Sequence, residues 1–298
     1  MNFLAKFLPI HQEKSMNRPK QSHTTQWQYD PFFQQAVKQQ PLSTGDVNHL
    51  PVKYFDASSL IAFFLVDYKK AQQVVRSHQV EVIKLARNKA LFSIAFYDYR
   101  ELTDGNPYFE VSPVILVRPK QAGYHAKSKL PLLDMALPTD RRNTGFWVVD
   151  LPVTDKLACV AGVEGWGYPK FVTEIDFRLS DDGFMGAVKH PQDNTQDIVR
   201  LQGQFGNRVP APWSDLVLYS ELDGDLIRAT SNTRTINGAK LAGKGDFVLT
   251  VGQSTHPMAQ RLRQLGVDGA QPLSVTYTDS LQLRLNEGVV FGEALQID

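Results

Sequence analysis

The stretch AGVEGWGYPKF, residues 161–171, holds three glycines, a proline and two large aromatic residues ahead of Lys170. Gly165 and Gly167 permit positive φ, and Pro169 stiffens the chain just before the lysine. Short apolar runs lie on either side of the stretch. We therefore expect an irregular turn between two strands, with Lys170 held at the start of the second strand.

Lys170 is the candidate reactive group of this stretch. Trp166, Tyr168 and Phe171 surround it in sequence, and an apolar setting disfavours the ammonium form and would lower the pKa of the lysine. A neutral amine attacks a carbonyl carbon, whereas an ammonium group does not. The structural alternative is that the segment is an ordinary turn with a solvated lysine, and the local sequence leaves that alternative open.

The rest of the chain reads mainly as short strands. Residues 172–179 alternate between apolar and charged side chains, which is typical of a half-buried strand. Similar patterns predict further strands at 92–97, 111–117, 146–151, 157–162, 247–251 and 274–285, and after Asn286-Glu287-Gly288. Short strands separated by Asp-Gly and Asn-Gly turns favour antiparallel pairing. The pattern predicts a β-rich α+β fold, with a curved or closed antiparallel sheet and helices on its outside.

Two segments read as helices. Asp67 is a plausible N-cap for the segment 67–78, which carries apolar residues on one face. Thr255 is a plausible cap for the segment 255–266, where Pro257 sits in the first turn and Gly266 ends the helix.

Composition points to one globular domain preceded by an extension. Residues 1–45 are polar, so we expect an extension that is disordered or drapes over a partner, followed by a domain at 46–298. The net charge of +1 gives no argument for nucleic acid or membrane partners. The N-terminus lacks a clear signal sequence, which predicts a cytoplasmic protein. Cys159 reads as a buried, inert thiol.

Motifs for common cofactors are missing from the sequence. It has no Walker phosphate loop, no Gly-x-Gly-x-x-Gly dinucleotide fingerprint and no Gly-x-Ser-x-Gly nucleophile elbow. Its seven histidines are scattered, and none pairs with another at metal-ligand spacing. We therefore predict neither a cofactor nor a metal.

Several segments together resemble the acetoacetate decarboxylase family. Gly162-Val163-Glu164 followed by Tyr168-Pro169-Lys170 is similar to the family's Gly-x-Glu and aromatic-Pro-Lys motif. Upstream, 108–111 (YFEV) looks like the family's Tyr-x-Glu segment. Residues 53–75 resemble its opening strand and helix, and 255–267 its C-terminal helix. The matches run in family order across roughly residues 50–290.

The resemblance implies a cone-shaped or closed β-barrel-like sheet decorated with a few helices, usually in a homo-oligomer. It implies that Lys170 forms a Schiff base with a small keto acid and that the protonated imine acts as an electron sink. Glu110 then matches the cavity carboxylate, and Glu164 matches a glutamate that orders the loop. The other residues expected at the substrate pocket are Ser93, Tyr108, Trp166, Tyr168 and Phe171.

Three departures from the family suggest a changed reaction. Phe171 replaces the family's second lysine, and Ser93 replaces its second cavity glutamate. Apolar residues near Phe64 and Leu65 stand where the family has an arginine that binds the substrate carboxylate. Arginines elsewhere are the alternative carboxylate ligands, namely Arg100, Arg118, Arg141 and Arg142. The losses favour an aldolase or dehydratase reaction, or a substrate larger or less acidic than acetoacetate.

Three functions therefore stay open. The first is a lysine Schiff-base lyase, either a decarboxylase or a divergent aldolase or dehydratase. The second is a non-catalytic small-molecule binding protein on the same fold, which the missing lysine and arginine would suit. The third is an assembly protein whose residues 1–45 contact a partner.

Overall fold

The computed structural model describes residues 27, 29–120, 131–243 and 245–292. The chain divides into two compact units, residues 1–34 and residues 35–298. In the first unit, Asp30 caps the short 3-10 helix η2 (Pro31–Phe33) by accepting a hydrogen bond from the backbone N–H of Phe32. The expected domain boundary after residue 45 stays a prediction, although residues 38–50 already pair as a hairpin within the second unit.

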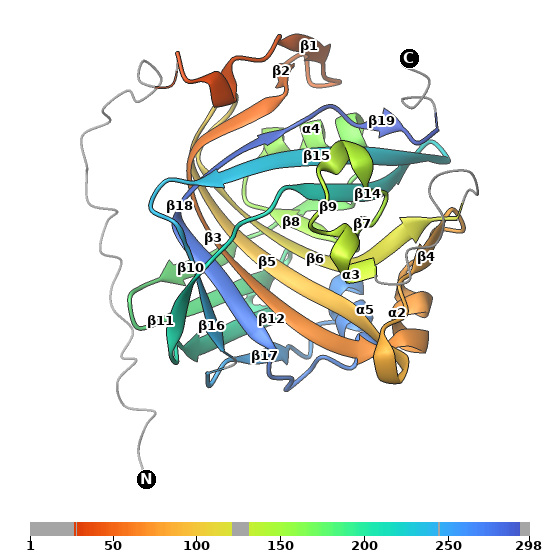
Figure 1. Cartoon of the computed structure of the whole chain (residues 1–298), viewed down its shortest axis with the longest axis vertical. Helices are drawn as coiled ribbons and strands as arrows, with labels where there is room; N and C mark the ends of the chain where they lie inside the picture. The colour runs from red at the N-terminus through yellow and green to blue at the C-terminus, as the bar shows by residue number, and fades with distance from the viewer. Residues whose placement is uncertain (1–26, 28, 121–130, 244, 293–298) are drawn as a thin grey trace. The chain divides into compact units, whose positions relative to one another are not determined.

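A closed barrel forms the centre of the second unit (Figure 1). The pairing runs β18-β3-β5-β6-β7-β14-β15, and β15 pairs back with β18 to close the ring. Every pair is antiparallel except β7 with β14, which is parallel. The strands are β3 (Val52–Asp67), β5 (Lys89–Leu102), β6 (Tyr108–Pro119), β7 (Gly145–Val148), β14 (Leu216–Leu222), β15 (Asp225–Thr235) and β18 (Ser274–Leu285). The predicted β-rich fold with a closed sheet and few helices is confirmed.

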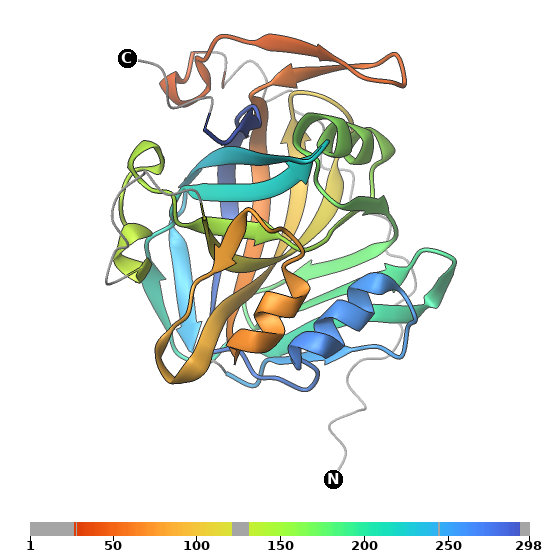
Figure 2. The ribbon, with the colours of Figure 1, turned by 90° about the vertical axis from the view of Figure 1, so that its right-hand side faces the viewer.

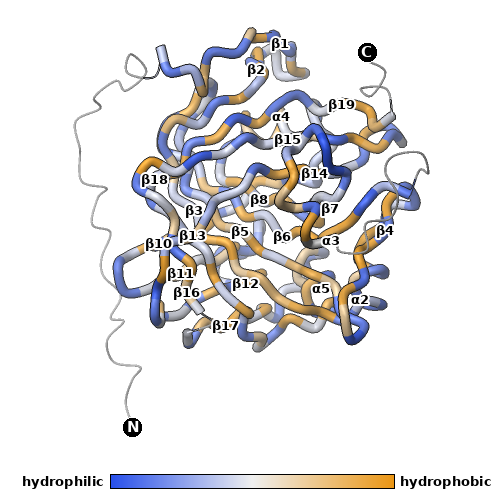
Figure 3. Tube along the Cα trace, in the orientation of Figure 1, coloured by the Kyte–Doolittle hydropathy of each residue, from blue (hydrophilic) through white to orange (hydrophobic). Residues whose placement is uncertain are grey.

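A second sheet and two helices cover the outside of β3, β5 and β6. The sheet has the order β10-β11-β12-β17, and helices α2 and α5 lie side by side next to it (Figure 2). The bounds are β10 (Ile175–Leu179), β11 (Gly183–His190), β12 (Asp193–Gln204), β17 (Val248–Val251), α2 (Tyr68–Val74) and α5 (Pro257–Leu265). Figure 3 shows hydrophobic stretches along the strands of the barrel, consistent with cores on both faces of the wall.

The two-residue period of β5 divides its side chains between two cores. Phe92, Ile94 and Phe96 pack into the outer core under the second sheet. Tyr97 belongs to the inner core, and Ser93 faces the same barrel interior. Because alternate residues of a strand point to opposite faces, this register decides which side chains reach the interior.

The remaining described elements are short. They are β1 (Lys38–Pro41), β2 (Val47–Leu50), β4 (Val80–Val82), β8 (Leu151–Val153), β9 (Lys170–Val172), β13 (Arg208–Ala211), β16 (Ala239–Gly243), β19 (Val289–Val290), α3 (Pro131–Asp134), α4 (Lys156–Trp166), η3 (Ala86–Asn88) and η4 (Thr139–Arg141). Of these, α4, β8 and β9 position the candidate site.

Both predicted helices exist, but one of the predicted caps is wrong. The Asp67 carboxylate accepts a hydrogen bond from Lys70 N and caps α2 as expected. Helix α5 is capped by His256 and not by Thr255, because the His256 Nδ1 accepts from Met258 N at 3.3 Å. Gly266 ends the helix in the left-handed region with φ 76°, as predicted.

The predicted strand at 157–162 is wrong, because these residues lie in helix α4. Asp155 caps the helix by accepting a hydrogen bond from Ala158 N at 2.8 Å. This N-cap lies just before the apolar run, and the strand prediction did not take it into account. Gly165 is therefore helical, and within 161–171 only Gly167 takes a positive φ, at 64°. Cys159, expected to be buried, is half-buried on this helix, and burial raises the pKa of its thiol.

The predicted strand at 172–179 is divided in two. Val172 ends β9, which pairs with β8 of the barrel sheet, whereas Ile175 begins β10 of the second sheet. The alternation of apolar and charged residues was identified correctly, but it could not show that the chain changes sheets at Thr173 and Glu174.

Candidate active site

Helix α4 and the turn after it place Lys170 at the barrel interior. Gly167 ends the helix, and its αL conformation turns the chain into β9, whose first residue is Lys170. There Lys170 pairs with Leu151 of β8 in parallel register. The lysine side chain runs back over Gly162 of the helix, which has no side chain to block it.

The Lys170 amine lies next to the Glu110 carboxylate. The distance between Lys170 Nζ and Glu110 Oε2 is 2.9 Å, and the two side chains are only 6% and 11% exposed. Glu110 comes from β6, directly opposite Tyr97 of β5. A pair so far removed from water interacts much more strongly than a surface ion pair. The two residues singled out as lysine nucleophile and cavity carboxylate are therefore in contact.

Both groups line a cavity of about 250 Å³ inside the barrel. Ser93 and Tyr168, expected at the pocket, line it too. The rest of its wall comes mostly from inward-facing residues of β3, β5, β6, β7, β14, β15 and β18 and from the segment before β14. Such an enclosed, mainly apolar cavity with a few convergent polar groups is typical of a small-molecule site.

A cluster of buried tyrosines surrounds the Glu110 carboxylate, and three of its members, Tyr54, Tyr97 and Tyr99, were not predicted. The Tyr54 and Tyr108 hydroxyls are 2.9 Å apart, and Tyr99 donates a hydrogen bond to Glu110 Oε1 at 3.4 Å. Burial first, and then the negative charge of Glu110, raise the pKa of Tyr54, Tyr97 and Tyr99. These side chains therefore stay protonated and act as hydroxyl donors at neutral pH.

Tyr168 is a further tyrosine that lines the cavity. Burial raises the pKa of Tyr168 well above its usual value, followed by the charge of Glu110. Its hydroxyl is buried and has no hydrogen-bond partner among the described residues. On β5, the residues Ser93, Tyr97 and Tyr99 lie at even spacing and therefore share one face of the strand. This spacing is the signal in the sequence from which the polar interior face could have been predicted.

Four residues expected at the pocket do not line the large cavity, and two of them are Glu164 and Phe171. Glu164 is half-buried on α4 and accepts hydrogen bonds from the backbone and hydroxyl of Ser43. Phe171 faces the other side of its strand, where its ring lies 4.5 Å from that of His256. The position at which the family has its second lysine therefore points away from the amine of Lys170, since neighbouring strand residues alternate.

Trp166 and Tyr108 lie behind the lysine. Both line a smaller pocket of about 30 Å³ that also touches Lys170. The Trp166 ring stacks parallel to Tyr168 with centroids 6.0 Å apart, and its Nε1 donates to the Asn286 carbonyl. Trp166 therefore supports the wall that carries Tyr168.

The four arginines considered as carboxylate ligands have other positions. Arg100 pairs with Asp56 and Asp98, and Arg118 pairs with Glu81. Arg142 is buried and donates to the backbone carbonyls of Met135 and Asp215. Arg141 is exposed, 4.0 Å from Asp140. None of the four lines the cavity.

Phe64 and Leu65 likewise lie outside the cavity. Phe64 packs into the outer core, and the side chain of Leu65 is exposed. The β3 residues that do face the cavity next to them are Ile61 and Phe63, which are also apolar.

Neither a metal site nor a membrane span is found in the part of the chain that the structure describes. Among those residues, no three His, Cys, Asp or Glu side chains group as metal ligands. Within the same residues, no helix combines the length and apolar character needed to span a membrane.

Comparison with known proteins places the fold. Acetoacetate decarboxylase from Legionella pneumophila is similar with a TM-score of 0.57 and 16% identity over 82% of this chain and 88% of that chain. A second acetoacetate decarboxylase structure gives a TM-score of 0.55 and 15% identity over 81% and 89% of the two chains. The enduracididine biosynthesis enzyme MppR, complexed with pyruvate, gives 0.56 and 11% identity over 85% and 95%.

Comparison of the sequence itself identifies a family rather than a single relative. A search of curated proteins returned no match. The family model described as acetoacetate decarboxylase matches residues 39–252, which is more than half of the chain. The matched range contains Glu110, the whole of α4 and Lys170. The chain therefore belongs to the acetoacetate decarboxylase family.

Proposed function

We propose that this chain is a lysine Schiff-base lyase that binds a small carbonyl compound covalently at Lys170. The observation that carries the proposal is the 2.9 Å contact between Lys170 Nζ and Glu110 Oε2 at the wall of a cavity large enough for a substrate. An amine and a carboxylate in contact supply both the nucleophile and the proton carrier that imine formation needs.

Imine formation would proceed through this pair. Proton transfer from the Lys170 ammonium to Glu110 frees the amine, which attacks the substrate carbonyl carbon. A proton on the nitrogen of the new C–N bond then moves to the former carbonyl oxygen, which gives a neutral carbinolamine. Glu110 then returns its proton to the carbinolamine hydroxyl, water leaves, and a protonated imine faces the restored carboxylate.

The protonated imine would withdraw electrons from the bond next to the former carbonyl. Loss of carbon dioxide from a β-keto acid, cleavage of an aldol, or removal of an α proton each leaves an electron pair that the imine accepts. In a dehydration the resulting enamine then returns this pair and expels the β-hydroxyl group, which leaves as water after taking up a proton. Glu110, whose carboxylate contacts the amine and lines the cavity, would move the protons in each of these reactions. Hydrolysis of the imine by water releases the product and regenerates the lysine.

Borohydride trapping tests this function directly. The purified chain is incubated with a panel of ketones, aldehydes and keto acids, reduced, digested and analysed by mass spectrometry. We expect a substrate-sized adduct on the peptide that contains Lys170, and no adduct on the Lys170→Arg variant. Carbon dioxide release then separates decarboxylation from the other reactions. Failure of every carbonyl compound to modify Lys170 would refute the proposal.

The second candidate is a small-molecule binding protein without catalysis. Phe171 in place of the family's second lysine, together with a mainly apolar cavity, favours it. Ligand-induced thermal stabilisation that survives Lys170→Ala supports this alternative, whereas a covalent Lys170 adduct that turns over supports the lyase. A cytoplasmic location and a homo-oligomeric state remain predictions from the sequence.

A further inference from the structure

We infer that the substrate is a neutral carbonyl compound with an apolar alkyl or aryl body, rather than a keto acid. The inference rests on the proposed Schiff base at Lys170 and adds the chemical class of the molecule that reaches it. It depends on three features of the cavity, which are its charges, the chemistry of its wall and its size.

The charges of the cavity are already balanced. Tyrosines aside, Lys170 and Glu110 are the only ionisable residues that line it within the described ranges. They contact each other at 2.9 Å, so the cationic group is occupied by an anion of the protein itself. A substrate carboxylate entering the same space would find no second cation there.

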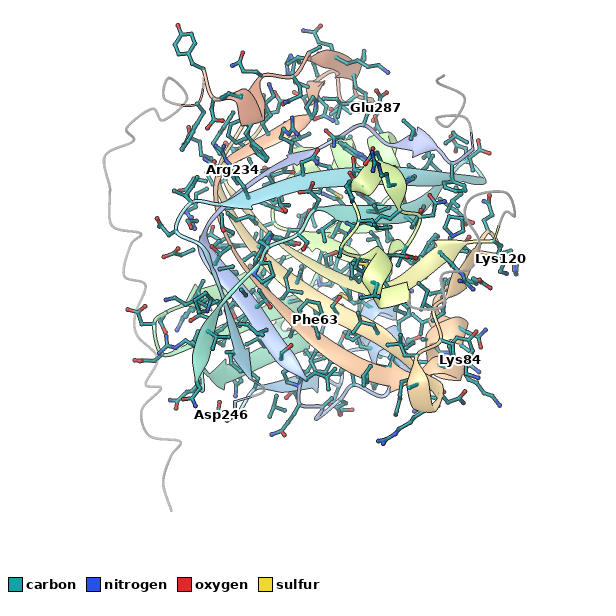
Figure 4. All side chains as sticks on the ribbon, viewed as in Figure 1. Phe63, Lys84, Lys120, Arg234, Asp246 and Glu287 are labelled. Atoms are coloured by element: carbon teal, nitrogen blue, oxygen red, sulfur yellow. The ribbon has the colours of Figure 1, made fainter. Side chains whose placement is uncertain are left out.

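The wall offers apolar surface and neutral hydroxyl groups. Phe63 of β3 lies in the middle of the barrel wall, whereas Lys84, Lys120 and Asp246 lie at the periphery (Figure 4). Apolar side chains face the cavity from every strand of the barrel except β15, and Trp213, just before β14, also lines it. The polar residues are mostly hydroxyl-bearing, namely Ser93, Ser112, Ser214, Ser231, Thr233 and Thr276 together with the tyrosines.

The size of the cavity exceeds the need of a short keto acid. A cavity of about 150 Å³ lined by apolar side chains suffices to hold benzene. The present cavity measures about 250 Å³. It therefore has room for a carbonyl group at Lys170 together with a body of about one aromatic ring.

Burial of a second anion would be costly here. A carboxylate loses its hydration in such a cavity and recovers it only if it is paired and hydrogen-bonded. Lys170 cannot supply the pairing, because as the nucleophile it must give up its charge to bond with the carbonyl. A neutral body avoids this cost and gains from contact with the aromatic and aliphatic wall.

The charge balance of the cavity also narrows the range of reactions that the site could catalyse. A substrate without a carboxylate cannot release carbon dioxide, which leaves cleavage or dehydration of a β-hydroxy carbonyl compound. In a cleavage, Glu110 would take the hydroxyl proton, the C–C bond would break, and its electrons would pass to the imine. An aldehyde leaves, and the resulting enamine takes the proton back at carbon from Glu110. Atoms and charge balance without any added oxidant or reductant.

Matched probes separate charge from size. Phenylacetone bearing a para-carboxamide and phenylacetone bearing a para-carboxylate differ in charge but hardly in shape. At equal concentration we expect borohydride to trap the carboxamide on Lys170 at least about tenfold more efficiently, which corresponds to about 1.4 kcal/mol. Equal or better trapping of the carboxylate would overturn the inference.

An added cation provides the reciprocal test. Phe63→Arg places a guanidinium at the cavity wall, and Phe63→Gln is its uncharged control. We expect Phe63→Arg to abolish or reverse the preference for the carboxamide and Phe63→Gln to retain it. An unchanged preference in a folded Phe63→Arg variant would count against a charge-based selection.

A binding measurement distinguishes failure of this inference from failure of the Schiff base. In the Lys170→Met/Glu110→Gln double variant the cavity carries neither charge, and calorimetry reports non-covalent affinity alone. Tighter binding of the carboxamide there supports the substrate class even if no adduct forms in the unmodified chain. Tighter binding of the carboxylate, or binding of neither probe, refutes it.

Discussion

The side chain of Lys170 occupies the space that a side chain at Gly162 would fill. A Cβ placed on Gly162 would lie 2.4 Å from Lys170 Cε and 2.5 Å from Cδ. Because both distances are well inside van der Waals contact, the chain can have the present lysine orientation or a side chain at 162, but not both. The glycine of helix α4 therefore directs the amine of β9 towards Glu110.

Gly162→Ala should separate reactivity from stability. The new methyl group pushes the flexible lysine off the helix and lengthens the contact with Glu110, so borohydride trapping should fall by at least about tenfold. The helix itself gains up to about 1 kcal/mol from replacing glycine by alanine, so the melting temperature should not collapse. Trapping efficiency and thermal unfolding, measured on the same preparation, check both parts.

Gly165→Ala is the matched control within the same helix. Its Cβ would meet the amide of Gln40, with Oε1 at 3.0 Å, and it would not contact the lysine. The Gln40 side chain can move aside, so trapping at Lys170 should stay close to that of the unmodified chain. A similar loss of trapping in both variants would show that helix α4, and not the space over Gly162, controls the lysine.

The buried ion pair should be sensitive to removal of one partner and tolerant of removal of both. Lys170→Met leaves Glu110 buried without its cation, and loss of one partner from a buried pair costs about 3–5 kcal/mol. The double variant Lys170→Met/Glu110→Gln leaves no charge behind and should recover most of this loss. Urea unfolding of the single and double variants measures the coupling between the two residues.

Glu110→Gln tests the role of the Glu110 carboxylate in catalysis. The amide keeps the shape of the carboxylate but cannot carry a proton away from the amine, so imine formation should slow by about 100-fold or more. An unchanged rate of trapping would remove Glu110 from the proposed mechanism while leaving Lys170 in place.

The sequence predicted the fold and the central pair because both leave local patterns. Alternation in β5 and β18 identified strands, and the motif around Lys170 brought Glu110 with it by resemblance. The strand predicted at 157–162 was wrong because an apolar run is ambiguous in period, and the decisive helix signal was the Asp155 cap outside the run. The orientations of Glu164 and Phe171 depend on pairing partners far away in the chain, which no local pattern contains.

The tyrosines show a second limit of the sequence. Tyr97 and Tyr99 shared a face with Ser93 by their spacing alone, so their common direction could have been predicted. Tyr54 joins them through the pairing of β3 with β5, and Tyr168 joins them through the turn after α4. Their convergence on Glu110 is a tertiary property, which explains why the motifs identified the carboxylate, Tyr108 and Tyr168 but not the other tyrosines around it.

Tyr168→Phe should affect reactivity more than stability. The buried Tyr168 hydroxyl has no hydrogen-bond partner among the described residues, so its removal leaves no other group unsatisfied. The free energy of unfolding should stay the same or rise by about 1 kcal/mol, and the ring keeps its stacking on Trp166. If the hydroxyl holds the substrate oxygen, trapping should fall about tenfold.

Tyr54→Phe is the control for this substitution. Its hydroxyl hydrogen-bonds Tyr108, so its removal leaves the buried Tyr108 hydroxyl without that partner. We expect a loss of about 1 kcal/mol or more in the free energy of unfolding, in contrast to Tyr168→Phe. Equal destabilisation by the two substitutions would contradict the assignment of the Tyr168 hydroxyl as a group without a hydrogen-bond partner among the described residues.

Helix α5 should lose stability on mild acidification, because its cap is a histidine. The His256 Nδ1 accepts a hydrogen bond from Met258 N, and protonation removes this acceptor and places a positive charge at the helix N-terminus. Burial lowers the pKa of His256 below its usual 6.5, and the nearby His190 and Arg261 lower it further, while the ring of Phe171 packs against it without charge.

The sign of the effect follows from the lowered pKa. The unfolded chain takes up the proton at a higher pH than the folded chain, so stability is fully present above pH 6.5 and is lost as the pH falls through the folded pKa. The expected loss is about 0.5–2 kcal/mol, the usual contribution of a cap. His256→Asn keeps a neutral acceptor at the cap, so it should flatten this part of the pH profile of thermal unfolding. A profile that keeps its slope in His256→Asn would assign the acid sensitivity to another group.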